Sequence, residues 1–148
     1  MPFSAYIIDQ IEVLISTKRN NMANISAHLI AEGGWHWIGF YIVNKKSDQL
    51  FLGPFEGPVE CTSRYNGNGR CSKSWVTNST VIVPNLHELA GHVACSLFIN
   101  YEVVIPLRHN GNAIAVLDID FINVDGFNQE EVKILEPVVS KLKKRWVG

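Results

Sequence analysis

The sequence lacks an excess of charge of either sign. Its 148 residues include 13 Lys and Arg against 14 Asp and Glu, which leaves a formal net charge of −1 at pH 7. Binding to nucleic acid or to an anionic membrane surface depends on a cluster of basic residues. Because the charges balance, the composition gives no reason to expect either of these partners.

Long apolar runs are also missing. No stretch reaches the roughly 18 apolar residues of a membrane-spanning helix, and the amino terminus has no basic segment followed by an apolar core. We therefore expect neither a membrane span nor a secretory signal, and we expect the protein in the cytosol. The length fits one domain that comprises residues 1–148.

Cysteine is scarce, and no two cysteines form a CxxC pair. The odd number, Cys61, Cys71 and Cys95, argues against a closed set of structural disulfides. Isolated cysteines are most often small buried hydrophobic residues, but all three lie in irregular segments, which weakens that interpretation. His92 and Cys95 are three residues apart, so a helix would place them on one face, where either thiolate activation or metal ligation is open. The other cysteines are widely spaced, and we expect no metal and no cofactor.

Apolar periodicity predicts helices at both ends of the chain. Residues 5–32 have apolar positions three or four apart, typical of one bent helix or two helical pieces, and the glycine pair at 33–34 would end it. Near the carboxyl end, Asn128 and Glu131 resemble the capping box of a final helix. Pro137 is expected to kink that helix.

Strand signals lie between these helices. Residues 35–52 predict one hairpin, residues 81–83 a short strand, and residues 102–107 and 113–120 a second hairpin around the turn signal Asn110-Gly111. The order contains no repeated βαβ unit. It predicts an α+β domain in which the terminal helices cover one face of an antiparallel sheet.

The segment 53–78 differs from the rest of the chain. It contains four glycines and two prolines and shows little periodicity. We expect a long loop there, and a loop of that length in a compact domain is usually functional or disordered. Its large residues Phe55, Tyr65 and Trp75 argue against disorder.

Acidic residues gather in the last predicted hairpin. In the strand 113–120, side chains alternate, so Asp118 and Asp120 share a face with Ile114 and Val116. Glu102 opens the neighbouring strand and should lie near both aspartates. Desolvation would raise the pKa of at least one of these acids, which suits a proton donor or a cradle for an ammonium group. The alternative, that the strand ends here and both aspartates meet solvent, is equally compatible with the spacing.

Two aromatic residues also share a strand face. Trp37 and Tyr41 are four residues apart in the first predicted strand, on the same side as Gly39. They could pack in the core, as aromatic strand residues usually do, or form the wall of a cavity that contacts a methyl group or sulfur. The spacing does not distinguish these two roles.

Five segments occur in an informative order: WIGFY (37–41), LGPFEGPVEC (52–61), GHVAC (91–95), YEVVIPL (101–107) and AVLDID (115–120). The cysteines follow one another at intervals of 10 and 24 residues. In these features, from about residue 23 to residue 131, the chain resembles the free methionine-(R)-sulfoxide reductases, small enzymes made of a single GAF domain. The resemblance implies a central antiparallel sheet with helices on one face and a ligand cavity under loops on the other.

The resemblance also implies roles for the cysteines. Cys95 would attack the sulfoxide sulfur of free L-methionine-(R)-sulfoxide, which releases methionine and leaves a sulfenic acid. Cys61 would resolve this acid as an intramolecular disulfide, which thioredoxin then reduces. Cys71 would be an auxiliary thiol. Two departures from the usual family pattern, Ser96 after the nucleophile and Ser72 after the middle cysteine, bear on rate more than on reaction type.

The remaining candidate residues match the substrate-binding positions of the same family. One protonated acid would donate to the sulfoxide oxygen, ionised acids would hold the ammonium group, and aromatic residues would surround the methyl group. These positions are Glu102, Asp118, Asp120, Trp37 and Tyr41. A homodimer is implied as well. Two alternatives stay open: a non-catalytic GAF sensor of a small molecule, and a redox switch that uses the same cysteines without turnover.

Overall fold

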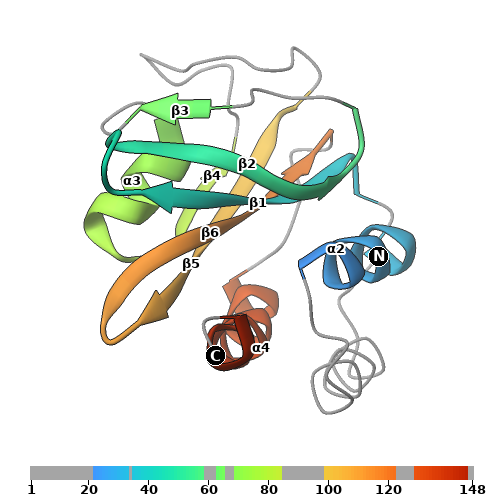
Figure 1. Ribbon diagram of the computed structural model, residues 1–148. Helices are drawn as coiled ribbons and strands as arrows, with labels where there is room; N and C mark the ends of the chain where they lie inside the picture. Colours follow the sequence, from blue (N-terminus) through green and yellow to red (C-terminus); the bar gives the residue numbers. More distant parts are fainter. Residues whose placement is uncertain are drawn as a thin grey trace.

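The computed structural model describes residues 22–33, 35–58, 63–65, 69–84, 99–122 and 129–146 (Figure 1). Two of the three predicted catalytic cysteines, Cys61 and Cys95, lie outside the described residues. The same is true of His92, of Asn128 and of residues 5–21 from the predicted first helix.

Six strands form one antiparallel sheet in the order β3-β2-β1-β6-β5-β4. The strands are β1 (Trp37–Asn44), β2 (Gln49–Glu56), β3 (Ser63–Tyr65), β4 (Val81–Pro84), β5 (Tyr101–His109) and β6 (Asn112–Phe121). Strand β6 lies between β1 and β5, so both of its edges are paired. Its apolar character on both faces, visible in the sequence, agrees with this central place.

Among the described residues, two helices cover one face of the sheet, and a third lies on the other. Helices α2 (Met22–Gly33) and α4 (Gln129–Trp146) bury Leu29 and Leu135 against the sheet residues Phe40 and Leu117. Figure 1 shows both helices on the same side of the sheet. Helix α3 (Gly69–Thr77) contributes to a second apolar cluster on the opposite face. The predicted α+β arrangement is confirmed, with α3 as an addition that the sequence did not predict.

Both predicted hairpins are present. Strands β5 and β6 are joined by Asn110 and Gly111, which have φ values of 52° and 81°. Positive φ at both central residues is the geometry of a type I′ turn, which the Asn-Gly pair favours. The turn between β1 and β2 is stabilised by Asn44, whose side-chain oxygen accepts hydrogen bonds from the backbone N–H groups of Lys46 and Ser47.

The prediction of one long loop over residues 53–78 is wrong. Strand β2 continues to Glu56 because Phe55 and Glu56 pair with Gly39 and Ile38 of β1. On its other edge, residues 49–51 pair with β3. Two β2 residues, Gly53 and Pro54, lie opposite the single β1 residue Phe40, which makes a β-bulge. The bulge accommodates Pro54, which has no N–H group to donate to the hydrogen bonds between the strands. Pairing with neighbouring strands thus outweighed the local glycine and proline signal.

Helix α3 forms within the same segment despite its serine, threonine and glycine content. Cys71 and Trp75 are four residues apart, and both contribute to the apolar cluster beside the sheet. Asn78 follows the helix with a φ of 54°, a left-handed conformation that commonly ends helices. Packing against the sheet, rather than intrinsic propensity, therefore explains this helix.

A second bulge alters one detail of the predicted strand pattern. Leu107 pairs with Ala115 and Arg108 with Ala113, so Ile114 has no direct partner in β5. Ile114 packs against the cluster on the helix α2 and α4 side instead of sharing the face of Asp118. From Val116 onward the predicted alternation holds.

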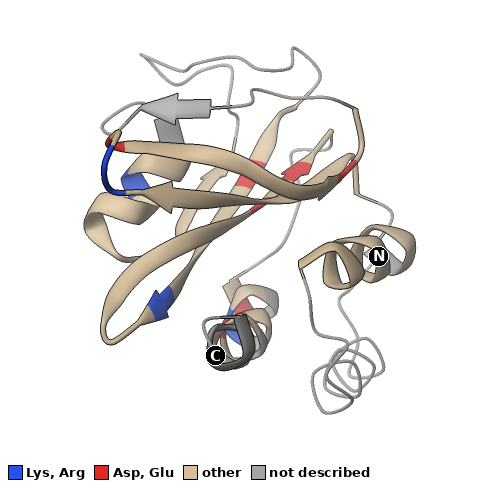
Figure 2. Ribbon diagram, in the orientation of Figure 1, with Lys and Arg blue, Asp and Glu red and all other residues tan. Residues whose placement is uncertain are grey.

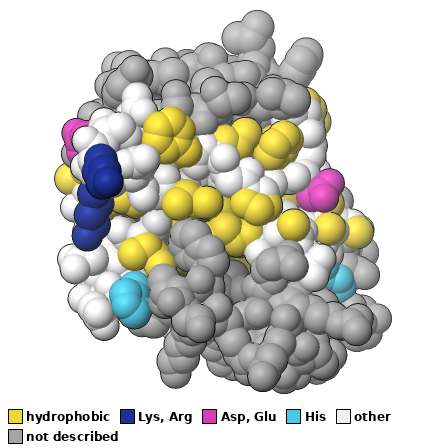
Figure 3. Space-filling model, in the orientation of Figure 1, with side chains coloured by type: hydrophobic (Ala, Val, Ile, Leu, Met, Phe, Trp, Pro, Cys, Tyr) yellow, Lys and Arg dark blue, Asp and Glu magenta, His cyan; other side chains and the backbone are white. Residues whose placement is uncertain are grey.

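Two further observations concern the helices and the surface. Helix α4 continues through Pro137, whose side chain is exposed, and within the described ranges no helix is both long and apolar enough to cross a membrane. On the face seen in Figure 3, hydrophobic side chains gather over β1 and β2, and charged side chains lie toward the margins.

Candidate functional site

Strand register brings the three predicted acids together. Asp120 of β6 pairs with Glu102 of β5 on one side and with Trp37 of β1 on the other. Asp118, two residues earlier on the same strand, pairs with Gly39 and Val104. Figure 2 shows the acidic positions of β5 and β6 side by side within the sheet. The prediction that Glu102 lies near both aspartates is confirmed.

All three acids are buried. The exposed fraction is 0% for Asp118, 3% for Asp120 and 4% for Glu102. Strand β6 continues to Phe121, so the aspartates do not mark the end of the strand. The interpretation in which both carboxylates meet solvent at a turn is therefore wrong.

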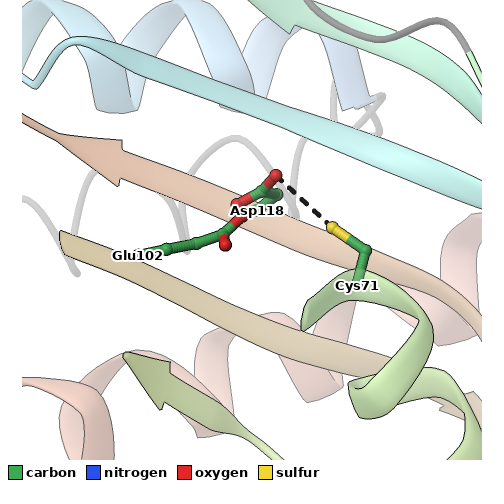
Figure 4. Close-up of side chains that lie close together, drawn as sticks. All are labelled: Cys71, Glu102 and Asp118. Atoms are coloured by element: carbon green, nitrogen blue, oxygen red, sulfur yellow. Dashed lines mark hydrogen bonds between the residues drawn. The ribbon is translucent and has the colours of Figure 1, made fainter. Parts of the chain in front are cut away.

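The thiol of Cys71, on helix α3, lies against the acids on the same face of the sheet. Cys71, in the first turn of α3, is fully buried, and its Sγ atom lies 3.4 Å from Oδ2 of Asp118 as a hydrogen-bond donor. Figure 4 shows Cys71 and Glu102 reaching Asp118 from α3 and β5. One ligand atom from each of these three residues lies within 4.8 Å of the other two, a spacing that a divalent cation could also bridge.

The environment of Asp118 favours its neutral form. Burial is the largest cause and raises its pKa well above the ordinary 3.8, because a carboxylate loses hydration inside the protein. The nearby Asp120, Cys71 and Glu102 raise the pKa of Asp118 further. A hydrogen bond between the side chains of Asp118 and Glu102 acts in the same direction. Asp118 can therefore act as a buried proton donor.

Aromatic rings form one side of the site. The indole ring of Trp37 stacks on Tyr41 and on Phe55, with centroid distances of 6.0 and 5.7 Å. Its Nε1 atom donates a 2.9 Å hydrogen bond to the carbonyl of Pro58. Gly39 lies directly beneath the ring, since a Cβ atom there would come within 2.4 Å of Trp37. The ring thus occupies the space beside Asp118 that a side chain at position 39 would fill.

The strand pattern of the sequence indicates Trp37 and Tyr41 as site residues but gives no such indication for Phe55. All three rings lie on the face of the sheet that carries the acids, and Phe55 is the cross-strand partner of Gly39. The available signal was an aromatic residue in a strand-like run. The glycines and proline around Phe55 concealed it by favouring a loop.

Helix α3 is fastened to the sheet at its carboxyl end. Arg108 of β5 donates hydrogen bonds to the side-chain oxygen and the carbonyl of Asn78, at 2.8 and 2.6 Å. The Asn78 side chain in turn donates to the carbonyl of Gly111 in the β5–β6 turn. These contacts help to set the position of the helix, and with it the position of Cys71 over Asp118.

Comparison with known proteins identifies the family. The chain matches the GAF domain family over residues 18–142. Its fold superimposes with a TM-score of 0.89 on the X-ray structure of a free methionine-R-sulfoxide reductase from Neisseria meningitidis, solved in complex with its substrate. The two sequences are 35% identical, and the match covers 95% of this chain and 86% of the other. The chain belongs to the free methionine-R-sulfoxide reductase family of GAF domains.

Two curated relatives extend this comparison. GAF domain-containing protein A from Dictyostelium discoideum is 37% identical over 92% of this chain and 87% of its own length. The free methionine-R-sulfoxide reductase of Saccharomyces cerevisiae is 34% identical over 76% of this chain and 63% of its own length. In this member of the reductase family, the acids, the aromatic wall and Cys71 all converge on one face of the sheet.

Proposed function

We propose that this protein reduces free L-methionine-(R)-sulfoxide to L-methionine, with thioredoxin as the reductant. The observation that carries the proposal is the buried acid cluster of Glu102, Asp118 and Asp120 beside stacked aromatic rings. Three buried acids in one place are costly unless a proton or a cationic ligand is held there. The reductases among the relatives support the same reaction.

Asp118 is the proton donor of the proposed reaction. Its raised pKa keeps a proton on the carboxyl group at a pH where an exposed aspartate would be ionised. Donation of this proton to the sulfoxide oxygen makes the sulfur more electrophilic. Glu102 and Asp120 then serve the other end of the substrate, where their carboxylates bind the ammonium group. A peptide nitrogen carries no such charge, which explains selectivity for the free amino acid.

The aromatic wall receives the apolar end of the substrate. Trp37 and Tyr41 are the residues that we assign to the methyl group and the sulfur, because thioether sulfur and methyl groups pack well on aromatic rings. The stacking of Trp37 between Tyr41 and Phe55 supports this role by holding the indole ring in one orientation.

The redox steps use the cysteines outside the described residues. The Cys95 thiolate attacks the sulfoxide sulfur, the oxygen passes to Cys95 as a sulfenic acid, and methionine leaves. The Cys61 thiol then displaces this oxygen as water and forms a disulfide with Cys95. Two thiols of reduced thioredoxin return both cysteines to the reduced state, so each turnover consumes two electrons and two protons.

The test is a single-turnover experiment. Fully reduced protein receives free methionine-(R)-sulfoxide without thioredoxin, and released methionine and remaining thiols are counted. We expect one methionine per chain and the loss of two thiols. The Cys95→Ser variant should release none. Methionine-(S)-sulfoxide and N-acetyl-methionine-(R)-sulfoxide, which lacks the ammonium charge, serve as matched substrate controls.

Other results would redirect the assignment. Binding of the sulfoxide without loss of thiols would favour a sensor, and thiol oxidation by peroxide but not by the sulfoxide would favour a redox switch. Full activity of the Cys95→Ser variant would rule out Cys95 as the nucleophile.

A further inference from the structure

Two of the buried acids are in direct contact with each other. The Glu102 side chain extends from β5 to the Asp118 carboxyl group (Figure 4), and one ligand atom from each lies within 4.8 Å of the other. A hydrogen bond joins the two side chains. Their exposed fractions are 4% and 0%. Two buried carboxyl groups in such contact share one proton, because two like charges side by side inside the protein are costly.

The contacts of Asp118 determine which group donates this proton. The Cys71 thiol is the donor in its 3.4 Å contact with Oδ2 of Asp118, so this contact does not use the Asp118 proton. The hydrogen bond with Glu102 favours the protonated form of Asp118. Asp118 therefore donates, and the Glu102 carboxylate accepts. Asp120 lies two residues along the same strand, a rise of about 6.6 Å, and acts on Asp118 through its charge.

We propose that Glu102 holds the proton of Asp118 in the substrate-free protein and gives it up when the ammonium group of the substrate binds. In the proposed reaction, the ammonium group lies on the carboxylates of Glu102 and Asp120. Its N–H groups then replace the Asp118 O–H group as donors to Glu102, and the O–H group is free to turn to the sulfoxide oxygen. This inference rests on the proposed function, because it concerns the timing of the same proton transfer.

The charge of the ammonium group acts in the same direction. Burial, together with Asp120, Cys71 and Glu102, raises the pKa of Asp118 in the substrate-free protein. A cation within about 4 to 6 Å lowers the pKa of a carboxyl group by about one to three pH units. Strands β1 and β4 contain no Asp, Glu, Lys, Arg or His that could oppose this effect. Asp118 thus becomes a stronger acid when the sulfoxide lies beside it.

The proton count of the proposed reaction is preserved. The proton that Asp118 gives to the sulfoxide oxygen stays on the oxygen of the Cys95 sulfenic acid. The proton that Cys95 lost when it formed a thiolate balances the one that Asp118 must regain. Glu102 changes its hydrogen-bond donor during this sequence but is neither oxidised nor reduced.

A pair of substrates tests whether the ammonium group controls the chemical step. The desamino analogue of methionine-(R)-sulfoxide has a hydrogen atom in place of the ammonium group and is otherwise identical. We compare the single-turnover rate of thiol loss at saturating concentrations of each substrate. The rate with the analogue should be about tenfold lower or less, as for a weaker general acid. Ammonium chloride should restore part of this rate, whereas sodium chloride at the same ionic strength should not.

Glu102→Gln tests the role of the acceptor. Glutamine keeps the side-chain length and an oxygen that accepts a hydrogen bond, but it has no negative charge. The saturated rates with and without the ammonium group should then differ by less than about threefold, because Glu102 no longer makes Asp118 a weaker acid. The matched control is Glu56→Gln, a strand glutamate whose partner Ile38 packs on the opposite face of the sheet. This variant should behave as the unmodified protein does.

Proton release on binding provides a measurement that needs no turnover. L-methionine carries the ammonium group but no sulfoxide oxygen. Its binding should release up to one proton at pH values between the lowered and the raised pKa of Asp118. Calorimetry in buffers with different ionisation enthalpies counts this proton. In Glu102→Gln the release should be less than about half of that in the unmodified protein, because the pKa of Asp118 is already lower.

Three outcomes would overturn the inference. Equal saturated rates with the two substrates in the unmodified protein would mean that the ammonium group contributes binding alone. A rate ratio that Glu102→Gln leaves unchanged would contradict the role of Glu102. Binding of L-methionine without proton release would contradict the change in Asp118, and this result does not depend on the folding of any variant. Failure of the proposed function is distinct, since the unmodified protein would then release no methionine from the sulfoxide.

Discussion

Replacement of Asp118 by asparagine should change how the stability of the protein depends on pH. The raised pKa means that the folded chain holds a proton on Asp118 which the unfolded chain has released above pH 3.8. Between 3.8 and the raised folded pKa of this group, the free energy of unfolding therefore falls as the pH rises. Below this window both states are protonated, and above it both are ionised, so the contribution to the slope vanishes.

The size of the effect follows from one proton. A full difference of one bound proton gives a slope of about 1.4 kcal/mol per pH unit. Asparagine does not titrate, so Asp118→Asn should lack this part of the slope and gain stability relative to the unmodified protein as the pH rises. Because the charges of Glu102 and Asp120 act on Asp118, the quantity to compare is the difference between the two proteins at each pH.

Urea unfolding at several pH values between about 4 and about 8 would measure this difference. This range begins near the ordinary pKa of aspartate and includes the pH values at which protein stability is usually greatest. Glu130→Gln, on the exposed surface of α4, is the control for the removal of one acid. A stability difference between Asp118→Asn and the unmodified protein that stays constant over this range would refute the reasoning. On the proposed function, the same variant should lose about 100-fold or more in kcat, as expected when a general acid is removed.

Two further substitutions test the contacts around the site. Gly39→Ala introduces a Cβ atom 2.4 Å from Trp37 and 2.6 Å from Cβ of Phe55, so overpacking should lower the free energy of unfolding by about 1 to 3 kcal/mol and displace the indole ring. Urea unfolding would measure the loss of stability, and KM would report the displaced ring. An unchanged KM would argue against the ring as part of the substrate site. Arg108→Ala removes both hydrogen bonds to Asn78 and should lower the free energy of unfolding, measured with urea, by about 2 kcal/mol. A loss below about 0.5 kcal/mol would mean that these hydrogen bonds do not hold α3 on the sheet.

The sequence determined those features whose signals are local or periodic. The Asn110-Gly111 pair specified the turn of the second hairpin, because both residues accept positive φ at low cost. Two-residue alternation placed Asp118 and Asp120 on one face of a strand, and the hairpin register then brought Glu102 beside them. The order of short motifs with the cysteine spacing was sufficient to predict the family.

Only the tertiary structure decided what depends on long-range packing. The glycines and prolines of residues 53–78 favoured a loop, but pairing with β1 and β3 and packing against the sheet produced β2, β3 and α3. The spacing left the burial of the aspartates open, because burial depends on the layer that covers the strand. The contact between Cys71 and Asp118 joins residues 47 positions apart, and no local pattern encodes such a distance.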